Sequence, residues 1–500
     1  AIIRTREEGF AYRVDSTATV GFIENSATTP QKLVALRDSE GVASVDQFGG
    51  DLRKAIEFGG AISLRGKTLT LSAKIEATLT GALKLFDGAI AYDGSHDEHV
   101  LFIDDPIGVH IEFKDFSVNA GKLANKGLSI QNNTSNDTPS TFVGNNLNVT
   151  RVQRSDAFLG GDGILLRGAF RSVTFNGGHI FDCELPAGQG TSGVVGISGI
   201  TGTWFSATSY IKSMVLNGTS IEKVYSSDLT YTFDQDGVKY FVPAEPAGNG
   251  KLPSEFIVKG GAQFRNCYGR SVKTQCRHTH IGQGTQFFRD EGLAGGVGNP
   301  EIDAQTGSLS VNPSTFVYSN GQVPFTCVLA GVDGANAGRS GAVVSGCEVF
   351  LDDTTVLERF FHTFPSGNES DPYSPVRVIG NRVFGEVRRF VDLSVNSEKN
   401  ILTCEDNWVN KVAVDDAVTE RNLIYVNKSG ASAGYAFIHA NRNVYLGAET
   451  VHLVRARIPN VTMDASVSAM GNIGFVDDLA GFGVDANDPS PLKSHAIKGK

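Results

Sequence analysis

Short apolar strands separated by polar corners dominate the chain from about residue 143 onward. Each repeat has about three apolar residues, a corner of two or three polar residues that often contains Gly or Asn, and then an aromatic or β-branched residue. The repeats are VTFNGGHIFDCE (173–184), MVLNGTSIEKV (214–224), FIVKGGAQFRNC (256–267), AVVSGCEVFLDD (342–353), VRVIGNRVFGEV (376–387), ILTCEDNWVNKV (401–412) and AFIHANRNVYLG (436–447). Because the corner recurs without a fixed repeat length, the pattern predicts the stacked coils of a parallel β-helix.

A β-sandwich is the alternative, since it also has many short strands and Gly-rich turns. It would favour strict alternation of apolar and polar residues and hairpin dipeptides such as Asp236-Gly237, which are few here. The composition, with 58 Gly and 3 Met in 500 residues, fits frequent turns rather than long helices. We therefore predict an all-β fold, a right-handed single-stranded parallel β-helix.

The two ends of the chain depart from this pattern. The segment 29–41, TPQKLVALRDSEG, has apolar residues at helical spacing and predicts a helical stem. The segment 51–59, DLRKAIEFG, predicts a short helix that caps the open end of the first coil, where an uncovered edge would pair with other chains. We expect an N-terminal stem over 1–45, a β-helix body with long inserted loops over 46–475, and a C-terminal tail over 476–500.

Charge, hydropathy and cysteine spacing exclude several classes of protein. With 44 basic and 54 acidic side chains, the net charge of −10 argues against nucleic-acid binding, which depends on basic charge. A run of about 18 apolar residues, the length of a spanning helix, is absent from the sequence, so we expect no membrane insertion. The six cysteines form no CxxC pair, which predicts buried, reduced thiols and neither a metal site nor a cofactor.

The opening of the predicted body resembles a known family. VDQFGG (45–50), DLRKAIE (51–57) and the strand GGAISLRGKTLTL (59–71) are similar to the opening of pectate-lyase-like β-helix proteins, in particular bacteriophage tailspike depolymerases. Asp46, Phe48 and Gly49 match that family's D-F-G-A element. The resemblance implies a homotrimer of the phage tail, part of the virion, that acts outside the cell. It would bind and cut capsular polysaccharide or lipopolysaccharide O-antigen.

A second, local resemblance concerns NCYGRSVKTQ (266–275). It is similar to the Arg-x-x-Lys strand of many carbohydrate-active β-helices, including the R-I-K element of polygalacturonases. The resemblance implies that Arg270 and Lys273 bind acidic sugar groups. The N-T-D and G-H-G elements of polygalacturonases are absent, which argues against that specific activity.

Acidic residues beside the corners are candidates for catalysis. Glycoside hydrolysis needs two carboxylates, about 5–5.5 Å apart for retention or about 6.5–9.5 Å apart for inversion. Since strands of successive coils lie about 4.8 Å apart, acids at equivalent places on neighbouring coils have such spacings. Asp182 and Glu184 follow one corner and Glu222 follows the next, so we predict these three as catalytic candidates of an endo-acting glycoside hydrolase. The alternative for each is a solvated polar ladder.

Further candidates lie in the longest excursion from the coils, 226–256, because long loops are often functional. It contains Asp234 and Asp236 as possible catalytic acids and Tyr231 as a surface for a sugar ring. A hairpin that makes subunit contacts is the alternative. Trp204, in a Gly/Ser/Thr-rich stretch, is a second candidate for sugar binding. His278 is a third, although a polar surface residue is its simpler interpretation.

Other functions on the same fold stay open. A lyase would use Arg270, Lys273 and His278 to neutralise and deprotonate a uronate, with acids on adjacent coils holding calcium. A receptor-binding fibre or adhesin would bind glycan without cutting it. A secreted pectinase-like monomer is the third alternative. We expect the hydrolase.

Overall fold

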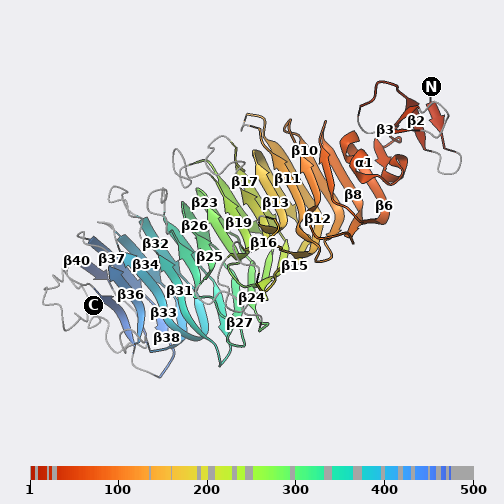
Figure 1. The fold of residues 1–500 in the computed structure, drawn as a ribbon. Coiled ribbons are helices and arrows are strands. Elements are labelled where there is room, and N and C mark those ends of the chain that lie inside the picture. Colours follow the sequence, from red (N-terminus) through yellow and green to blue (C-terminus); the bar gives the residue numbers. More distant parts are fainter. Residues whose placement is uncertain are drawn as a thin grey trace. The chain divides into compact units, whose positions relative to one another are not determined.

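The computed structural model describes residues 2–5, 10–19, 22–24, 31–134, 137–158, 160–188, 193–200, 209–227, 234–242, 252–292, 299–331, 341–363, 374–395, 400–414, 421–428, 434–448, 451–457, 463–468 and 472–473. The chain divides into two compact units, Ala1–Asp228 and Leu229–Lys500. Nearly all regular structure in both units is β (Figure 1). The tail expected over 476–500 lies outside the described residues.

The first unit begins with an antiparallel sheet of four strands in the order β1-β2-β4-β3. These strands are β1 (Ile2–Arg4), β2 (Ala11–Val14), β3 (Phe22–Glu24) and β4 (Lys32–Ala35). The helical stem predicted over 29–41 is therefore wrong. In β4, Leu33 and Ala35 are buried at a spacing of two, and pairing with β2 and β3 occupies both edges of the strand. Tertiary pairing thus overrides a modest helix propensity.

The short helix predicted over 51–59 is confirmed as α1 (Leu52–Phe58). Asp51 caps it by accepting a hydrogen bond from the Lys54 amide at 3.1 Å, and its apolar side packs against β7 (Ile75–Thr78). It follows β5 (Val42–Ser44) and the 3-10 helix η1 (Val45–Phe48). Figure 1 places α1 at the end of the strands β6 and β8, where it covers the first coil.

Parallel strands build the rest of the first unit. They are β6 (Gly60–Leu71), β7, β8 (Leu83–Tyr92), β9 (Asp97–Asp104), β10 (His110–Asn119), β11 (Ala124–Asn132), β12 (Ser140–Gln153), β13 (Gly161–Gly168), β14 (Phe170–Asn176), β15 (His179–Leu185), β16 (Val194–Ile200), β17 (Ser213–Asn217) and β18 (Ser220–Ser226). Each pairs in parallel with its equivalent one coil later, as β15 does with β18. This pairing is that of a parallel β-helix, and the prediction is confirmed.

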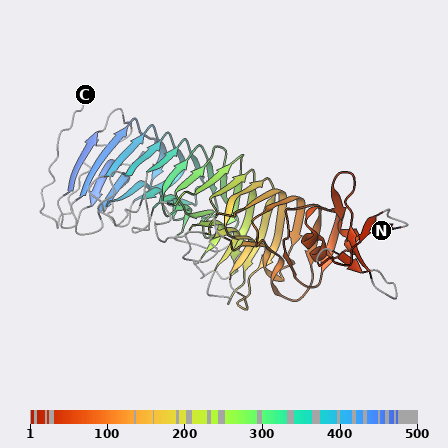
Figure 2. The ribbon, with the colours of Figure 1, turned by 90° about the horizontal axis from the view of Figure 1, so that it is seen from above.

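Stacked parallel strands continue in the second unit (Figure 2). Their pairings form three rows, which we call the first, second and third sheets. The first sheet contains β19 (Gln235–Phe241), β22 (Val272–Gln275), β25 (Pro300–Ala304), β28 (Thr326–Ala330), β31 (Val356–Thr363), β33 (Arg382–Val395), β36 (Asn422–Lys428) and β39 (His452–Arg457). The second contains β20 (Glu255–Lys259), β23 (His278–Ile281), β26 (Ser308–Val311), β29 (Ala342–Ser345), β32 (Ser374–Ile379), β34 (Asn400–Glu405), β37 (Gly434–Asn441) and β40 (Met463–Ser468). The third contains β21 (Gln263–Cys267), β24 (Gln286–Arg289), β27 (Thr315–Tyr318), β30 (Glu348–Leu351), the first half of β33, β35 (Trp408–Val412) and β38 (Val444–Tyr445).

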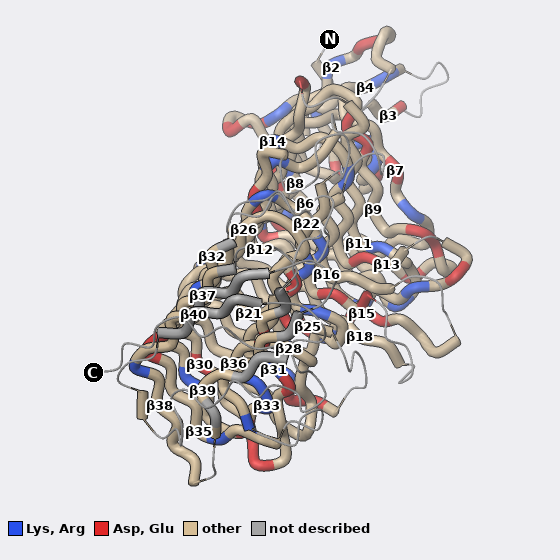
Figure 3. The backbone as a smooth tube through the Cα atoms, turned by 90° about the vertical axis from the view of Figure 1, so that its left-hand side faces the viewer, with Lys and Arg blue, Asp and Glu red and all other residues tan. Residues whose placement is uncertain are grey.

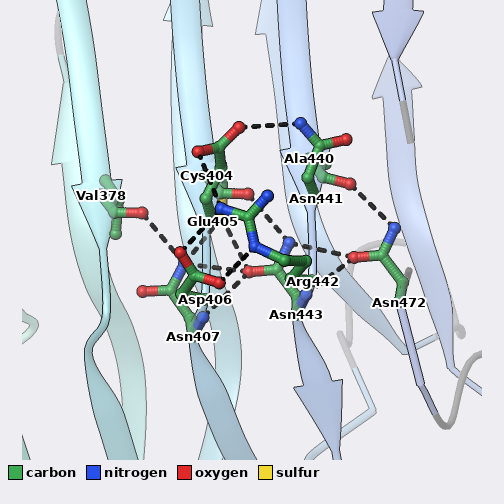
Figure 4. A network of polar contacts seen from close by, with 10 residues as sticks. All are labelled: Val378, Cys404, Glu405, Asp406, Asn407, Ala440, Asn441, Arg442, Asn443 and Asn472. Carbon is green, nitrogen blue, oxygen red and sulfur yellow. Dashed lines mark hydrogen bonds and ion pairs between the residues drawn. The ribbon is translucent and has the colours of Figure 1, made fainter. Parts of the chain in front are cut away.

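The corners seen in the sequence are left-handed turns of the backbone. Gly177 and Gly380, for example, have φ of +65° and +66°, a conformation that disfavours residues with a Cβ atom. In the second unit the residue after several of these corners is a buried Asn. Asn407 accepts from Asn381 and donates to Asn443, at 3.0 and 2.9 Å, and the ladder continues to Asn472 (Figure 4). These amides satisfy backbone groups that the turn leaves unpaired.

The interior of each coil stack is apolar. Phe264, Phe287 and Phe316 stack on successive coils with ring centroids 5.3 and 4.8 Å apart. The six cysteines are buried and free, as predicted. Since the interior is filled, chemistry must come from the outward-facing side chains and the loops.

Candidate functional site

Six charged residues meet on the first sheet of the second unit, and we call them the Asp234 cluster: Asp234, Asp236, Lys239, Arg270, Lys273 and Asp303. Register explains the meeting, because Lys239 pairs with Lys273 on the next coil and Lys273 pairs with Asp303 on the following one. Lys239, Lys273 and Asp303 alternate with the buried residues Val238, Val272 and Ile302, so these three side chains point away from the interior of the coil. Figure 3 shows basic and acidic residues along the strands.

Asp234 is the centre of this cluster. Its Oδ1 accepts hydrogen bonds from Lys273 Nζ at 2.7 Å and Arg270 Nη1 at 3.1 Å, and its Oδ2 accepts one from Lys239 Nζ at 3.0 Å. About a quarter of the Asp234 side-chain surface is exposed, at 27%. Burial alone would raise the pKa of Asp234, but the charges of Lys239 and Lys273 outweigh it and hold the pKa well below its usual range.

Asp236 and Asp303 have the opposite environment. Complete burial, with Asp234 nearby, raises the pKa of Asp236 to about 6. Its Oδ1 lies 3.4 Å from Arg270 Nη1, and its Oδ2 has no hydrogen-bond partner. Burial likewise raises the pKa of Asp303, whose Oδ2 lies 2.8 Å from Arg270 Nε without the alignment of a hydrogen bond. The cluster therefore combines one ionised carboxylate, two carboxyl groups that resist ionisation, and three cations.

A second group lies in the first unit, and we call it the Lys122 cluster: Lys122, Gln153, Asp182, Glu184 and Tyr225. Lys122 Nζ donates to Asp182 Oδ1 at 2.5 Å and to Glu184 Oε2 at 2.7 Å. Tyr225 OH donates to Asp182 at 3.2 Å, and Gln153 donates to Glu184 at 3.0 Å. The predicted pair of Asp182 and Glu184 thus exists, with both carboxylates on one ammonium group.

The chemistry of this pair differs from that of a catalytic acid and base. Burial would raise the pKa of Glu184, but the hydrogen bond and charge of Lys122 lower it overall. Asp182 has φ of +63° and makes a bend within β15, opposite Arg151 of the preceding coil and Lys223 of the next, which share the conformation. With its pKa lowered in this way, Glu184 has no proton to donate at neutral pH.

The remaining predicted residues do not join either cluster. Glu222 pairs with Phe181 in the sheet, and its carboxylate lies 3.4 Å from His179 Nε2. His278 is exposed on β23 of the second sheet, where its Nδ1 contacts Ser308 Oγ at 2.6 Å, whereas Lys273 lies on β22 of the first sheet. Trp204 and Tyr231 lie outside the described residues.

Several members of these clusters escaped the sequence analysis. Lys239 and Asp303 could have been found by aligning GVKY (237–240), SVKT (271–274) and EIDA (301–304), in which the third residue always faces outward. Lys122 carries no such signal, because it lies in the turn between β10 and β11. Tyr225 pairs with Glu184 and could have been found by aligning β15 with β18.

Neither the comparison with protein-family models nor the searches of curated proteins and of solved structures found a match. Within the described ranges, three or more His, Cys, Asp or Glu side chains nowhere form a group able to hold a metal ion. The described part of the chain also has no helix long and apolar enough to cross a membrane.

Proposed function

We propose that this chain binds an acidic polysaccharide of the bacterial surface at the Asp234 cluster and cleaves it by glycoside hydrolysis. The convergence of Lys239, Arg270 and Lys273 on one ionised carboxylate carries the proposal. Three cations surround Asp234, while burial raises the pKa of the other two carboxyl groups. Arg and Lys supply charge-assisted hydrogen bonds to acidic groups, which supports recognition of a sugar acid.

The two aspartates differ in pKa as an acid and its ionised partner do in glycosidases. In this proposal Asp236 gives a proton to the departing sugar oxygen, and Asp234 supplies the negative charge opposite the anomeric carbon or orients the attacking water. Arg270 lies against both aspartates. Since Asp236 has no exposed surface, the acidic group of the substrate must draw Arg270 aside before the proton is transferred.

The complete burial of Asp236 also favours a second candidate, a glycan-binding protein without catalysis. Such a protein needs only the cations and a carboxylate that orients them. The lyase has less support, because Lys273 and His278 lie on different sheets. Its base would therefore have to come from another residue.

The proposal extends to a tailspike-type homotrimer in the virion, exposed to the bacterial surface. It is supported by the parallel β-helix and by the opening sequence, where Asp46 pairs with Lys67 at 2.8 Å and the 3-10 helix has a capping box at Ser44. A sedimentation experiment that gives a monomer would contradict the trimer and favour the pectinase-like alternative.

The function is tested by incubating the full chain with purified acidic capsular and O-antigen polysaccharides and with neutral ones of matched length. We expect binding and shorter oligosaccharides from an acidic polymer only, with no ultraviolet absorbance from unsaturated sugars. Asp236→Asn should retain binding and lose cutting, and Lys273→Gln should weaken binding about tenfold or more.

Matched variants decide between the clusters. Glu184→Gln, in the Lys122 cluster, should cut normally. Loss of cutting in Glu184→Gln with full activity in Asp236→Asn would move the active site to the first unit. Binding without shorter products, for all polymers tested, would establish the non-enzymatic candidate, and absence of binding would refute the proposal.

A further inference from the structure

A second basic cluster lies on the same sheet as the Asp234 cluster, farther along the second unit. We call it the Arg359 cluster: Phe325, Thr326, Arg359, Arg389, Asp392 and Asn422. Arg359 Nε and Arg389 Nη1 both bind Asp392 Oδ2, at 2.5 and 2.8 Å. Two guanidinium groups thus share one carboxylate. Burial lowers the pKa of the adjacent His362 to about 4, so this imidazole is neutral at pH 7 and one positive charge remains in excess.

The strand register places the Arg359 cluster over the same positions of the first sheet as the Asp234 cluster, several coils later. Asp303 of the Asp234 cluster pairs with Leu329, Leu329 with His362, and His362 with Asp392. In a parallel column, Thr326 pairs with Arg359, Arg359 with Arg389, and Arg389 with Asn422. Arg270 precedes β22, three coils before Arg359 on β31 and four before Arg389 on β33. At about 4.8 Å for each coil, Arg359 and Arg389 lie about 14 and 19 Å from Arg270.

Polar atoms without partners mark the second cluster. Thr326 Oγ1, Arg359 Nη1 and both amide atoms of Asn422 are buried and have no hydrogen-bond partner. Asn422 has no exposed surface and Thr326 has 1%. Buried polar groups are nearly always paired, and here the orphaned atoms are on one column of one sheet. They offer donors and acceptors to a polar ligand.

Aromatic rings complete the surroundings. The Arg359 guanidinium lies 4.1 Å from the centroid of the Phe325 ring, and that of Arg389 lies 4.2 Å from the centroid of Tyr425. Phe325 is 37% exposed. The rings hold the planar guanidinium groups in fixed orientations, and Phe325 presents apolar surface beside them. A charged group next to an apolar ring face suits an acidic sugar.

We infer that the Arg359 cluster is a second anion-binding subsite for the same acidic polysaccharide, so that the polymer runs along the first sheet of the second unit and places acidic groups about 14 to 19 Å apart. The inference rests on the proposed function for the nature of the polymer. Two subsites on one chain increase affinity, because binding at the first raises the effective concentration at the second. A short oligosaccharide reaches only one of them.

Oligogalacturonates of increasing length, labelled at the reducing end, test this inference by fluorescence anisotropy. They carry an acid on every sugar, so that one is always in register with each subsite. The full chain with Asp236→Asn is used, since this variant prevents cleavage. We expect affinity to increase in a step of about tenfold or more once the oligomer spans both clusters. The double variant Arg359→Gln/Arg389→Gln should lose the step and bind short oligomers unchanged.

Two further variants separate recognition from damage to the fold. Asp392→Asn removes the internal competitor for both guanidinium groups, and we expect it to strengthen the binding of long oligomers only, an effect that unfolding cannot produce. Arg382→Gln, an exposed cation paired with Glu348 on the third sheet, should change nothing. Equal affinity for short and long oligomers, or no gain with Asp392→Asn, would overturn the second subsite and leave the proposed function intact. Absence of binding at every length would overturn both.

Discussion

The pH dependence of stability in Asp236→Asn tests the electrostatics of the Asp234 cluster. Burial, with Asp234 nearby, raises the pKa of Asp236 from 3.8 to about 6. The side chain has no exposed surface, so solvent screens this effect little. A change of about two pKa units corresponds to about 3 kcal/mol, at about 1.4 kcal/mol for each unit.

The direction of this pH dependence follows from the number of protons that each state binds. Between pH 4 and pH 6 the unfolded chain has lost the proton of Asp236 while the folded chain keeps it, so the free energy of unfolding decreases as the pH rises. The decrease is complete above pH 6. Asn cannot ionise, so the free energy of unfolding of the variant does not decrease in this way. We therefore expect Asp236→Asn to gain about 3 kcal/mol relative to the wild type between pH 4 and pH 7.

Urea unfolding of both proteins, followed by far-ultraviolet circular dichroism between pH 4 and pH 8, measures this difference. Asp290→Asn is the control. Burial would raise the pKa of Asp290, but its hydrogen bond from Arg265 lowers it from 3.8. Asp290 is therefore ionised in both the folded and the unfolded chain above about pH 5, and the stability difference between this variant and the wild type should stay nearly constant from there to pH 8. A difference between wild type and Asp236→Asn that stays constant from pH 4 to pH 7 would refute the raised pKa and, with it, the proposed proton donor.

Three other predictions concern the fold and the first unit. Asn407→Ala removes a buried amide that bonds to Val378, Asn381 and Asn443, and it should lower the free energy of unfolding in urea by about 3 kcal/mol or more. Asn176→Ala removes a partly exposed amide that bonds to Asn145 and should cost about 1 kcal/mol. Equal costs would contradict the role of burial. Phe287→Ala removes the middle ring of the interior stack and should cost about 3–5 kcal/mol, while Phe350→Ala, 38% exposed, should cost less than about 1 kcal/mol. Lys122 lowers the pKa of Glu184 despite burial, so Glu184→Gln should lose stability at pH 7, and this loss should shrink as the pH falls below 4.5. A penalty that does not change with pH would show that the ion pair is not its source.

The coils could be predicted because each one repeats the same local requirement. A strand must end at a left-handed corner, and Gly, Asn or Asp is needed there or next to it, as at Gly380 with Asn381. The capping helix was predictable for the same kind of reason, an Asp at its start and a row of apolar residues on one side. The strand β4, which replaces the helix predicted over 29–41, was not predictable, because it depends on partners about twenty residues away in the sequence.

Part of the candidate site could also be predicted from the sequence. Asp234, Asp236, Arg270 and Lys273 were chosen from the sequence and come together in the structure. Asp182 and Glu184 also lie together, but the shared Lys122 changes their chemistry. From the sequence, Arg270 and Lys273 follow Asp182, Glu184 and Glu222 on the next recognisable coil, whereas the structure assigns these acids and cations to two separate units.

The sequence by itself determined the parallel β-helix, its corners and the residue types that face outward, because strand period and turn geometry are local properties of the chain. Only the tertiary structure decided which charges meet. Lys239, Lys273 and Asp303 are separated by about thirty residues each, yet they lie on neighbouring coils. The lengths of the intervening loops set that register, and burial and neighbouring charges then raise the pKa of Asp236 and lower that of Asp234.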